Sequence, residues 1–498
     1  MSKVNWIKNI EHLFTEDQLK KFPENITGIA FDSRLVKPGN IFVCYQGRTI
    51  NSNEFIDDAI KKGAILIISD DQLQLQIHRD VAVFYIENTR NALSFLSDAF
   101  YNSPSKDLYT IGITGTDGKS TTAFLIYSIL KKLDFNVSLI STLGIYINGQ
   151  EVSMDKDKTR LTTPDPPDLF YLIQTAKKAG STHIILEMTS HALNLDKVNP
   201  VKLDCAIFTS FSPDHQEFHD TEEDYFTSKS KIINLLKPNG HLILNADNLK
   251  LSALSKQADS SISVGFNPNA DVSIKKTKES LFNIDYLFKT DEGDFSGSTQ
   301  LMGDFNLMNI AMAYVSSLKS GAAQSKIIDA IKDCDNVPGR FERINGAPFH
   351  VIVDYAHTPD AFEKILNTLS SYITKRLIVV FGCAGERSKE RRIGLGKLTA
   401  EKADMSIITE EDSRSESIHD IVQDIENEMK KAGSTAGNDY KIILDRREAI
   451  KFSLQYAEKD DFVLILGKGH EKSIELNGEF IPWDDRKITN ELINIIYN

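Results

Sequence analysis

Cysteines are few in this sequence, and long apolar runs are missing. The 498 residues include four cysteines, at positions 44, 205, 334 and 383, and no two of them form a CxxC pair. This spacing excludes a small disulfide-framed secreted domain and predicts a reduced, cytoplasmic compartment. No apolar run approaches the roughly 20 residues of a membrane helix, and the first residues lack the apolar core of a signal peptide. We therefore expect no transmembrane segment.

Positive charge is also in short supply. Lys and Arg number 57 against 70 Asp and Glu, so the formal net charge is −13. This balance argues against sequence-independent nucleic-acid binding, and we expect no nucleic-acid partner. Small anionic ligands are not excluded, because a local pocket can be positive on an acidic protein.

The pattern along the chain alternates strands and helices. The length suggests about three domains, and polar or Pro-bearing breaks place them at 1–104, 105–339 and 340–498. Such alternation predicts an α/β fold with mostly parallel sheets covered by helices. Residues 267–302 alternate polar and apolar side chains instead, which predicts an antiparallel insert. Most distinctive polar clusters follow a predicted strand, where open parallel sheets bind ligands.

The clearest of these clusters follows the predicted strand 109–113. Residues 114–121 read TGTDGKST and lead into a predicted helix, 121–133. Glycines let the backbone approach phosphate oxygens, and the N-terminus of a helix favours anions. Lys119 would reach the β- and γ-phosphates of ATP, and Ser120 or Thr121 would bind Mg²⁺. The spacing is not the standard GxxxxGK[ST], because Gly112 lies six residues before Gly118. A Gly-rich turn without a ligand is the alternative.

The segment TGTDGKSTT resembles the TGTNGKTTT signature of the Mur ligases and their folylpolyglutamate synthetase relatives. Those enzymes use ATP to join an amino acid to a carboxylate through an acyl phosphate. About ten motifs resemble the MurE type, in order, over nearly the whole chain. The resemblance implies three α/β domains: an N-terminal UDP-binding domain, a central P-loop ATPase domain and a C-terminal Rossmann-like domain. We expect a monomer.

The resemblance also implies the nucleotide and metal residues. Glu187, in EMTSH, and His215, in SPDHQEFH, would bind Mg²⁺ together with Ser120. Lys229 matches the lysine that is carbamylated in MurE-type enzymes, and as a carbamate it would be a further Mg²⁺ ligand. Outside that motif it would be read as a solvated helix residue. Lys119, Glu187, His215 and Lys229 are the candidate catalytic residues. Asn306 would contact adenine, cap the following helix, or both. The candidate ATP contacts are Gly115, Thr116, Asp117, Gly118, Lys119, Ser120, Thr121, Asn306, Arg340, Asp354 and His357.

Further motifs resemble the part of MurE-type enzymes that binds UDP-MurNAc-L-Ala-D-Glu. Lys197 stands where the family usually has Arg, so it keeps the charge without the bidentate fork. Thr162 and Thr163 lie in a TTPD segment that could equally be a capped turn before a helix. Asn51-Ser52-Asn53 replaces a segment in which the family has His. The candidate contacts are Ser33, Thr162, Thr163, Thr189, Ser190 and Lys197.

The incoming amino acid would bind in the C-terminal domain. By resemblance, Arg387 would hold its α-carboxylate, Glu471 its distal amine, and Gly467 would shape the pocket. The selector segment, DNPR in enzymes that take meso-diaminopimelate, is here Glu411-Asp412-Ser413-Arg414. Arg414 favours a side-chain carboxylate, whereas Asp412 disfavours one. We expect meso-diaminopimelate, and L-lysine and L-ornithine remain open.

Together these features predict an ATP-dependent ligase that adds a diamino acid to the D-Glu γ-carboxylate of UDP-MurNAc-L-Ala-D-Glu in peptidoglycan synthesis. Two alternatives remain at this point. One is a Mur-type amide ligase with a different acceptor. The other is a nucleotide-binding protein that has lost catalysis, against which the joint presence of Lys119, Glu187, His215 and Lys229 argues.

Overall fold

The computed structural model describes residues 8–47, 50–72, 81–153, 161–212, 219, 221–334 and 336–497. The chain divides into two compact units. Unit 1 comprises residues 1–275, 286–297 and 308–331, and unit 2 comprises 276–285, 298–307 and 332–498. The boundaries of the three predicted domains stay a prediction. Within the described ranges, no helix has the length and apolar character needed to cross a membrane.

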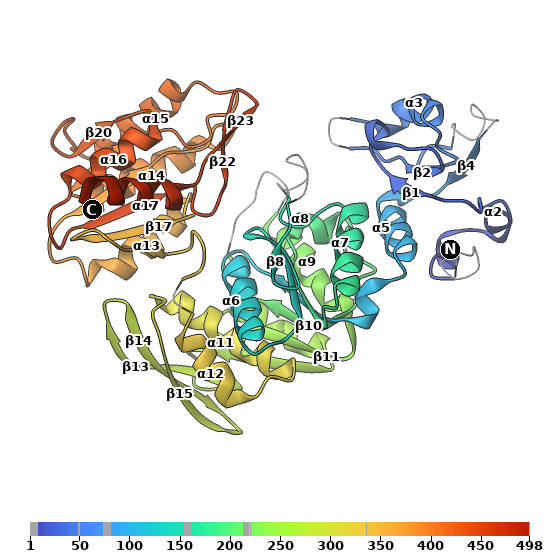
Figure 1. The fold of residues 1–498 in the computed structure, drawn as a ribbon, viewed down its shortest axis with the longest axis horizontal. Helices are drawn as coiled ribbons and strands as arrows, with labels where there is room; N and C mark the ends of the chain where they lie inside the picture. Colours follow the sequence, from blue (N-terminus) through green and yellow to red (C-terminus); the bar gives the residue numbers. More distant parts are fainter. Residues whose placement is uncertain are drawn as a thin grey trace. The chain divides into compact units, whose positions relative to one another are not determined.

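The first sheet of unit 1 has four parallel strands in the order β1-β2-β3-β4 (Figure 1). Its strands are β1 (Gly28–Ala30), β2 (Asn40–Val43), β3 (Leu66–Ser69) and β4 (Ala82–Tyr85). Its helices are η1 (Glu11–Leu13), α2 (Glu16–Lys20), η2 (Ser33–Leu35), η3 (Ser52–Phe55), α3 (Ile56–Lys61) and α5 (Thr89–Phe100). Strands β2 and β3 are buried throughout. The Pro-bearing break at the predicted boundary between residues 104 and 105 lies in η4 (Pro104–Asp107).

The second sheet has eleven strands in the order β15-β14-β13-β12-β11-β10-β5-β9-β6-β7-β8. Its central strands pair in parallel, as the alternating pattern predicts. These strands are β5 (Tyr109–Thr114), β6 (Val137–Ser141), β9 (His183–Glu187), β10 (Leu203–Phe208), β11 (Leu236–Asn245) and β12 (Ser260–Gly265). Strands β7 (Gly144–Ile147) and β8 (Gln150–Glu151) form an antiparallel edge. Strands β5 and β9, side by side, both end beside the predicted phosphate loop.

Helices and short turns connect these strands. They are α6 (Lys119–Lys132), α7 (Pro166–Lys178), α8 (Ser190–Asn194), α9 (Glu222–Ser230), η5 (Lys231–Leu235), α10 (Leu249–Ser252) and η6 (Ala253–Gln257). The predicted insert consists of three consecutive strands, β13 (Val272–Ser280), β14 (Asn283–Thr290) and β15 (Gly293–Thr299). Helices α11 (Asp304–Lys319) and α12 (Gln324–Lys332) follow.

Unit 2 contains a six-stranded sheet in the order β16-β17-β21-β18-β19-β20 (Figure 1). The strands are β16 (Glu342–Ile344), β17 (His350–Asp354), β18 (Leu377–Phe381), β19 (Met405–Ile408), β20 (Tyr440–Ile442) and β21 (Phe462–Leu466). All pairs are parallel except β16 with β17. The helices are α13 (Pro359–Ser370), α14 (Lys389–Lys402), α15 (Ile418–Lys431), α16 (Arg446–Tyr456) and α17 (Asp485–Tyr497), and β22 (Ser473–Leu476) and β23 (Glu479–Pro482) form a separate hairpin.

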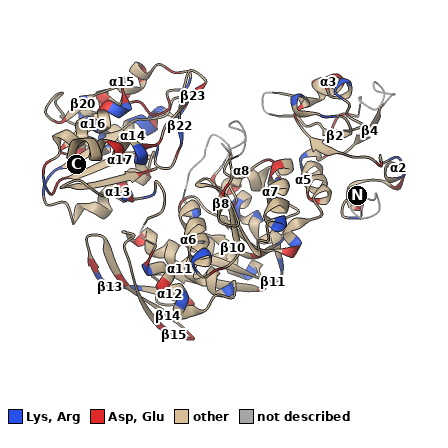
Figure 2. Cartoon of the chain, in the orientation of Figure 1, with Lys and Arg blue, Asp and Glu red and all other residues tan. Residues whose placement is uncertain are grey.

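The central strands of this sheet are buried on both faces, because alternate side chains enter the cores on either side. On one face, strand residues pack against α16 and α17 through Ile450, Leu454 and Leu492. Acidic and basic residues both occur along the helices of each unit (Figure 2). The predicted α/β class and its parallel sheets are confirmed. The polar clusters singled out in the sequence follow β5, β9, β10, β17, β19 and β21.

Candidate functional site

The phosphate loop is held in a shape that two glycines allow. Gly118 has φ +82°, and a Cβ there would lie 2.4 Å from Oδ1 of Asn309. Gly115 has φ +150°, and a Cβ would lie 2.0 Å from Oγ1 of Thr209. Both positions combine a backbone conformation that other residues rarely adopt with neighbours that leave no room for a side chain. The loop is therefore pressed against its surroundings and ends directly at the first turn of α6.

Two lysine ammonium groups meet at this loop. Lys119 Nζ donates to the carbonyls of Gly115 (3.0 Å) and Thr116 (2.8 Å). Lys229, only 1% exposed, donates to the same Gly115 carbonyl at 2.6 Å. Its ammonium also lies 4.4 Å from the centre of the Tyr225 ring. Two cations at one carbonyl give the loop a positive character that suits phosphate groups.

The segment after β10 supports the loop from the other side. Oγ1 of Thr209 donates to the Asp117 carbonyl at 2.6 Å, and the Asp117 N–H donates to Oγ of Ser210 at 2.8 Å. Oγ1 of Thr116 donates to the carbonyl of Ser212 at 3.1 Å. The sequence predicted the loop but missed these supporting residues. Their signal was their place directly after a strand that neighbours β5.

A carboxylate at the end of β9 faces the start of α6. Oε1 of Glu187 accepts a hydrogen bond from Ser120 Oγ at 2.8 Å, and Oε2 accepts one from the N–H of Thr142 at 3.0 Å. Oγ1 of Thr142 also lies 2.9 Å from Oγ1 of Thr162. The structure therefore brings together two of the predicted metal ligands, both oxygen donors of the kind Mg²⁺ prefers. His215 lies outside the described residues, and the described residues contain no group of three or more His, Cys, Asp or Glu side chains that could hold a metal ion.

The threonines predicted to contact the substrate peptide surround this carboxylate. Oγ1 of Thr163 donates to the backbone carbonyl of Glu187 at 2.9 Å and accepts from the N–H of Thr189 at 3.1 Å. Thr189 also caps the N-terminus of α8. The Ser190 hydroxyl lies 3.1 Å from Nε2 of His219. Thr162, through Thr142, together with Thr163 and Thr189 thus forms one hydrogen-bond network with Glu187, whereas the Ser190 hydroxyl contacts His219.

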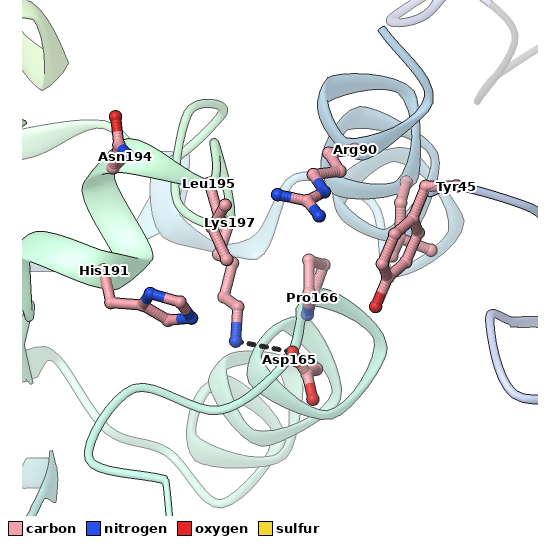
Figure 3. A pocket seen from close by; sticks show the side chains of 9 residues that line it. Tyr45, Arg90, Asp165, Pro166, His191, Asn194, Leu195 and Lys197 are labelled. Carbon is pink, nitrogen blue, oxygen red and sulfur yellow. Dashed lines mark ion pairs between the residues drawn. The ribbon is translucent and has the colours of Figure 1, made fainter. Parts of the chain in front are cut away.

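Lys197 borders a pocket in unit 1. Its ammonium pairs with Asp165 at 2.7 Å (Figure 3). The pocket has a cavity volume of about 310 Å³. It is lined by Tyr45, Arg90, Leu93, Asp165, Pro166, His191, Asn194, Leu195 and Lys197. Arg90 was not predicted from the sequence. Ser33, the predicted uridine contact, is buried in η2, where its carbonyl accepts a hydrogen bond from Lys62 at 3.1 Å.

Three further predicted nucleotide residues lie in unit 2: Arg340 just before β16, Asp354 at the end of β17 and His357 after it. The guanidinium of Arg340 lies 4.3 Å from the centre of the Tyr355 ring, and its Nε is buried without a hydrogen-bond partner among the described residues. Asp354 accepts the N–H groups of Phe341 (2.6 Å) and Ala356 (2.5 Å). Burial raises the pKa of Asp354, although Arg340 opposes the shift. Nδ1 of His357 lies 2.8 Å from the Tyr355 carbonyl.

Asn306 does not cap α11, which corrects one part of the prediction. The helix begins at Asp304, so Asn306 lies inside its first turn. Its Nδ2 donates to the Met302 carbonyl at 2.8 Å and thereby closes the turn before the helix. The predicted adenine contact stays a prediction. Thr121 is buried in the first turn of α6.

A buried lysine organises the predicted amino-acid pocket. Nζ of Lys468 pairs with Asp412 at 2.7 Å and with Glu471. The second oxygen of Asp412 accepts the N–H of Glu475 at 2.7 Å. Burial opposes the charge on Lys468, but the carboxylates of Glu471 and Asp412 outweigh it and raise its pKa. Both oxygens of Asp412 are thus occupied within the protein. The sequence placed Asp412 and Glu471 here but did not predict that Lys468 joins them.

Glu411 directly precedes Asp412 in the chain and is 5% exposed. Burial raises its pKa to about 7, although Arg446 opposes the shift. Its Oε2 has no hydrogen-bond partner among the described residues. At Gly467, with φ +111°, a Cβ would lie 2.4 Å from this oxygen. Gly467 therefore shapes the pocket by leaving room for the Glu411 carboxyl. Arg446 itself forms a buried ion pair with Asp485 at 2.7 Å.

Arg414 is held loosely between two carboxylates. Its side chain lies 3.9 Å from Glu386 and 3.8 Å from Glu475. The residue has φ +55°, a conformation unusual for a side chain of this size. Such long ion pairs leave the guanidinium able to take a closer carboxylate from a ligand. Arg387 follows β18 in the same unit and is partly buried.

The chain matches known proteins over its whole length. Residues 25–101 match the model described as Mur ligase family, catalytic domain; 113–317 match the Mur ligase middle domain; and 339–469 match the Mur ligase, glutamate ligase domain. A UDP-N-acetylmuramoyl-L-alanyl-D-glutamate–2,6-diaminopimelate ligase of Bacillus velezensis is 35% identical over 500 residues, covering 98% of each chain. The enzyme of the same name from Alkaliphilus metalliredigens is 34% identical and covers 94% of this chain and 93% of its own.

Solved structures agree with these matches. A structure of a UDP-N-acetylmuramoyl-L-alanyl-D-glutamate–2,6-diaminopimelate ligase is 27% identical, covers 100% of both chains and superposes with a TM-score of 0.69. MurF ligase from Thermotoga maritima, solved in complex with ADP, is 19% identical over 94% of this chain and 96% of its own, with a TM-score of 0.60, and so shares the fold. The chain belongs to the Mur ligase family and, within it, to the MurE type.

Proposed function

We propose that this protein is an ATP-dependent ligase that attaches a diamino acid to the D-Glu γ-carboxylate of UDP-MurNAc-L-Ala-D-Glu. The observation that carries the proposal is the cluster at the ends of β5 and β9. There the phosphate loop, two lysine ammonium groups and the Ser120–Glu187 pair lie together. Full-length similarity to ligases of that name supports the same reaction. The four buried free cysteines are consistent with a cytoplasmic location.

The chemistry assigned to the loop is phosphoryl transfer from ATP to the γ-carboxylate. Lys119 would offset the charge that spreads over the transferring phosphoryl group. Ser120 and Glu187 are oxygen donors 2.8 Å apart that would hold Mg²⁺. Bound there, the cation would neutralise phosphate charge. The amine of the incoming diamino acid then attacks the acyl phosphate, phosphate leaves from the tetrahedral intermediate, and the amine proton is lost to the surroundings.

Lys229 has two candidate roles at this site. Unmodified, it donates to the Gly115 carbonyl and helps hold the loop. Carbamylated, it would become an anion able to bind a cation, as the resemblance to MurE-type enzymes implies. The Lys229 side chain contacts the Gly115 carbonyl and lies beside Tyr225, so either form would act next to the phosphate loop.

We propose meso-diaminopimelate as the amino acid. Arg414, held only by ion pairs of 3.8 and 3.9 Å, would take its side-chain carboxylate. Asp412 disfavoured that ligand in the sequence, but Lys468 and the Glu475 N–H compensate its charge. Glu471 would take the distal amine. L-Lysine and L-ornithine are the competing substrates, and Arg414→Ala should raise KM for meso-diaminopimelate about 10- to 100-fold relative to L-lysine.

The decisive experiment is phosphate release with ATP, Mg²⁺ and UDP-MurNAc-L-Ala-D-Glu, run separately with meso-diaminopimelate, L-lysine and L-ornithine. Turnover that depends on one of them supports the ligase and identifies the amino acid. Lys119→Ala should abolish turnover, whereas Lys256→Ala, which removes an exposed lysine of the same unit, should not. Absence of turnover with all three amino acids would refute the proposed acceptor or amino acid.

A further inference from the structure

The pocket beside Lys197 joins two parts of unit 1 that are far apart in sequence. Tyr45 and Arg90 belong to the region of the four-stranded sheet, whereas Asp165, His191 and Lys197 belong to the region of the eleven-stranded sheet. Figure 3 shows the Arg90 guanidinium and the Lys197 ammonium on two sides of one opening. None of the motifs that resemble the family includes Arg90.

Helix α5 fixes this arrangement through direct hydrogen bonds. Nδ2 of Asn88 donates to Asp196 at 3.0 Å. Oγ of Ser94 donates to the backbone carbonyl of Lys197 at 2.9 Å. A third bond, from Asn199 to Asn91, measures 2.9 Å. The helix that carries Arg90 therefore also holds the backbone of the second cation, so the two charges are placed by one element.

Arg90 is itself held in place while most of its donors stay unused by these contacts. Its guanidinium lies 4.9 Å from the centre of the Tyr45 ring, and one NH₂ donates to the Gln46 carbonyl at 3.0 Å. Guanidinium has five N–H donors in a rigid fork. Within the described ranges, no carboxylate forms an ion pair with Arg90, whereas Lys197 is neutralised by Asp165. The lining thus has a net positive charge, supplied by Arg90.

We propose that Arg90 binds the diphosphate of the nucleotide-sugar substrate. This inference rests on the proposed function, in which Ser33 contacts uridine and Thr189 and Ser190 contact the peptide. The pocket lining comes from both regions: Tyr45 and Arg90 come from the region of the four-stranded sheet that also carries Ser33, and His191 follows Ser190 directly in the chain. In the substrate, the diphosphate is the link between uridine and the muramoyl peptide. A planar fork suits two adjacent phosphate groups better than an ammonium does.

Equilibrium binding of UDP and of uridine to the full-length protein tests this assignment. Arg90→Met should raise the Kd for UDP about 10- to 100-fold, which is the effect of losing a hydrogen-bonded charge. The Kd for uridine should change less than about twofold. Arg90→Lys should recover part of the UDP affinity. Arg447→Met, which removes an exposed arginine paired with Glu491 in unit 2, is the matched control and should leave both constants unchanged.

The comparison of UDP with uridine separates direct binding from loss of local structure. If Arg90 only held Tyr45 and the Gln46 carbonyl in place, Arg90→Met would weaken uridine and UDP equally, and the proposal would be overturned. An unchanged UDP affinity, or no UDP binding by the unsubstituted protein, would overturn it as well. Because binding needs no turnover, an Arg90-dependent UDP affinity in a protein without ligase activity would refute the proposed function and keep this inference.

Discussion

Removing Lys468 should destabilise unit 2, and removing Asp412 as well should reverse part of that loss. Lys468 is the cation shared by Asp412 and Glu471, and its side chain is 2% exposed. In Lys468→Met, two carboxylates lose their common partner while they remain largely buried. In the double variant with Asp412→Asn, only Glu471 is left as a charged group without its partner.

The size of the effect follows from burial. Breaking a fully buried ion pair by removing one partner costs about 3–5 kcal/mol. The side chains of Asp412 and Glu471 are 16% and 33% exposed, so water relieves part of the cost. We therefore expect Lys468→Met to lower the free energy of unfolding by about 3 kcal/mol, the lower end of that range. The double variant should be more stable than this single variant by about 1–2 kcal/mol, because one uncompensated carboxylate has gone.

Urea unfolding followed by tryptophan fluorescence can measure this difference within unit 2. The chain has two tryptophans, so Trp6→Phe leaves Trp483 as the only reporter. Trp483 Nε1 donates to Asp485 at 2.8 Å, which places the reporter in the folded part of unit 2. Lys430→Met, which removes an exposed i,i+4 ion pair with Glu426, is the control and should cost less than about 0.5 kcal/mol. A Lys468→Met cost that matches this control, or a double variant less stable than Lys468→Met, would refute the reasoning.

Three further results are expected. Burial raises the pKa of Glu411 from 4.5 to about 7, so its contribution to stability is fully present below pH 4.5 and is lost as the pH rises to 7. Glu411→Gln should therefore unfold like the unsubstituted protein at pH 4 and be more stable at pH 8 by up to about 3 kcal/mol, and equal stabilities at pH 8 would contradict the assignment. Gly118→Ala should lower kcat at least about tenfold and weaken ATP binding, because φ +82° and the Asn309 side chain both oppose a Cβ; unchanged steady-state kinetics would show that the loop adapts. Lys229→Ala should lose activity, and rescue by an added small carboxylate such as acetate would support a carbamate, whereas full activity without rescue would remove that role.

The phosphate loop could be predicted from the sequence because its determinants are local. A buried strand, two glycines and a Lys-Ser pair lie within a few residues, and each has one structural reason to be there. Because parallel strands end at the same edge of a sheet, residues far apart in the chain could also be predicted to meet. Strands β5 and β9 pair in register, so Glu187 at the end of β9 reaches Ser120 just beyond the end of β5. The rule that polar residues after parallel strands meet at one edge of the sheet was sufficient to predict both the phosphate loop and the position of Glu187.

The charge balance of the amino-acid pocket could not be predicted in the same way. The sequence shows Asp412 where a neutral amide was expected, and its charge argues against a carboxylate ligand. Only the fold shows that Lys468, 56 residues later, lies 2.7 Å from it. The net charge that a side chain presents to a ligand depends on its ion-pair partner, because a buried pair is neutral while either member alone is charged. The interpretation of Asp412 therefore changes once its partner is included.

Arg90 shows the limit of reasoning from strand ends. It starts a helix rather than following a strand, and its neighbours in sequence bear no motif. Its relation to Lys197 depends on bonds such as that between Asn88 and Asp196, which are 108 residues apart. This site lies between a helix that packs near one sheet and a loop that belongs to another sheet. The register of paired strands does not determine which residues of such a helix and loop face each other. Such sites are found by asking which charged side chain lines a cavity without an ion-pair partner. Among the lining residues of this pocket, Arg90 has no such partner within the described part of the chain.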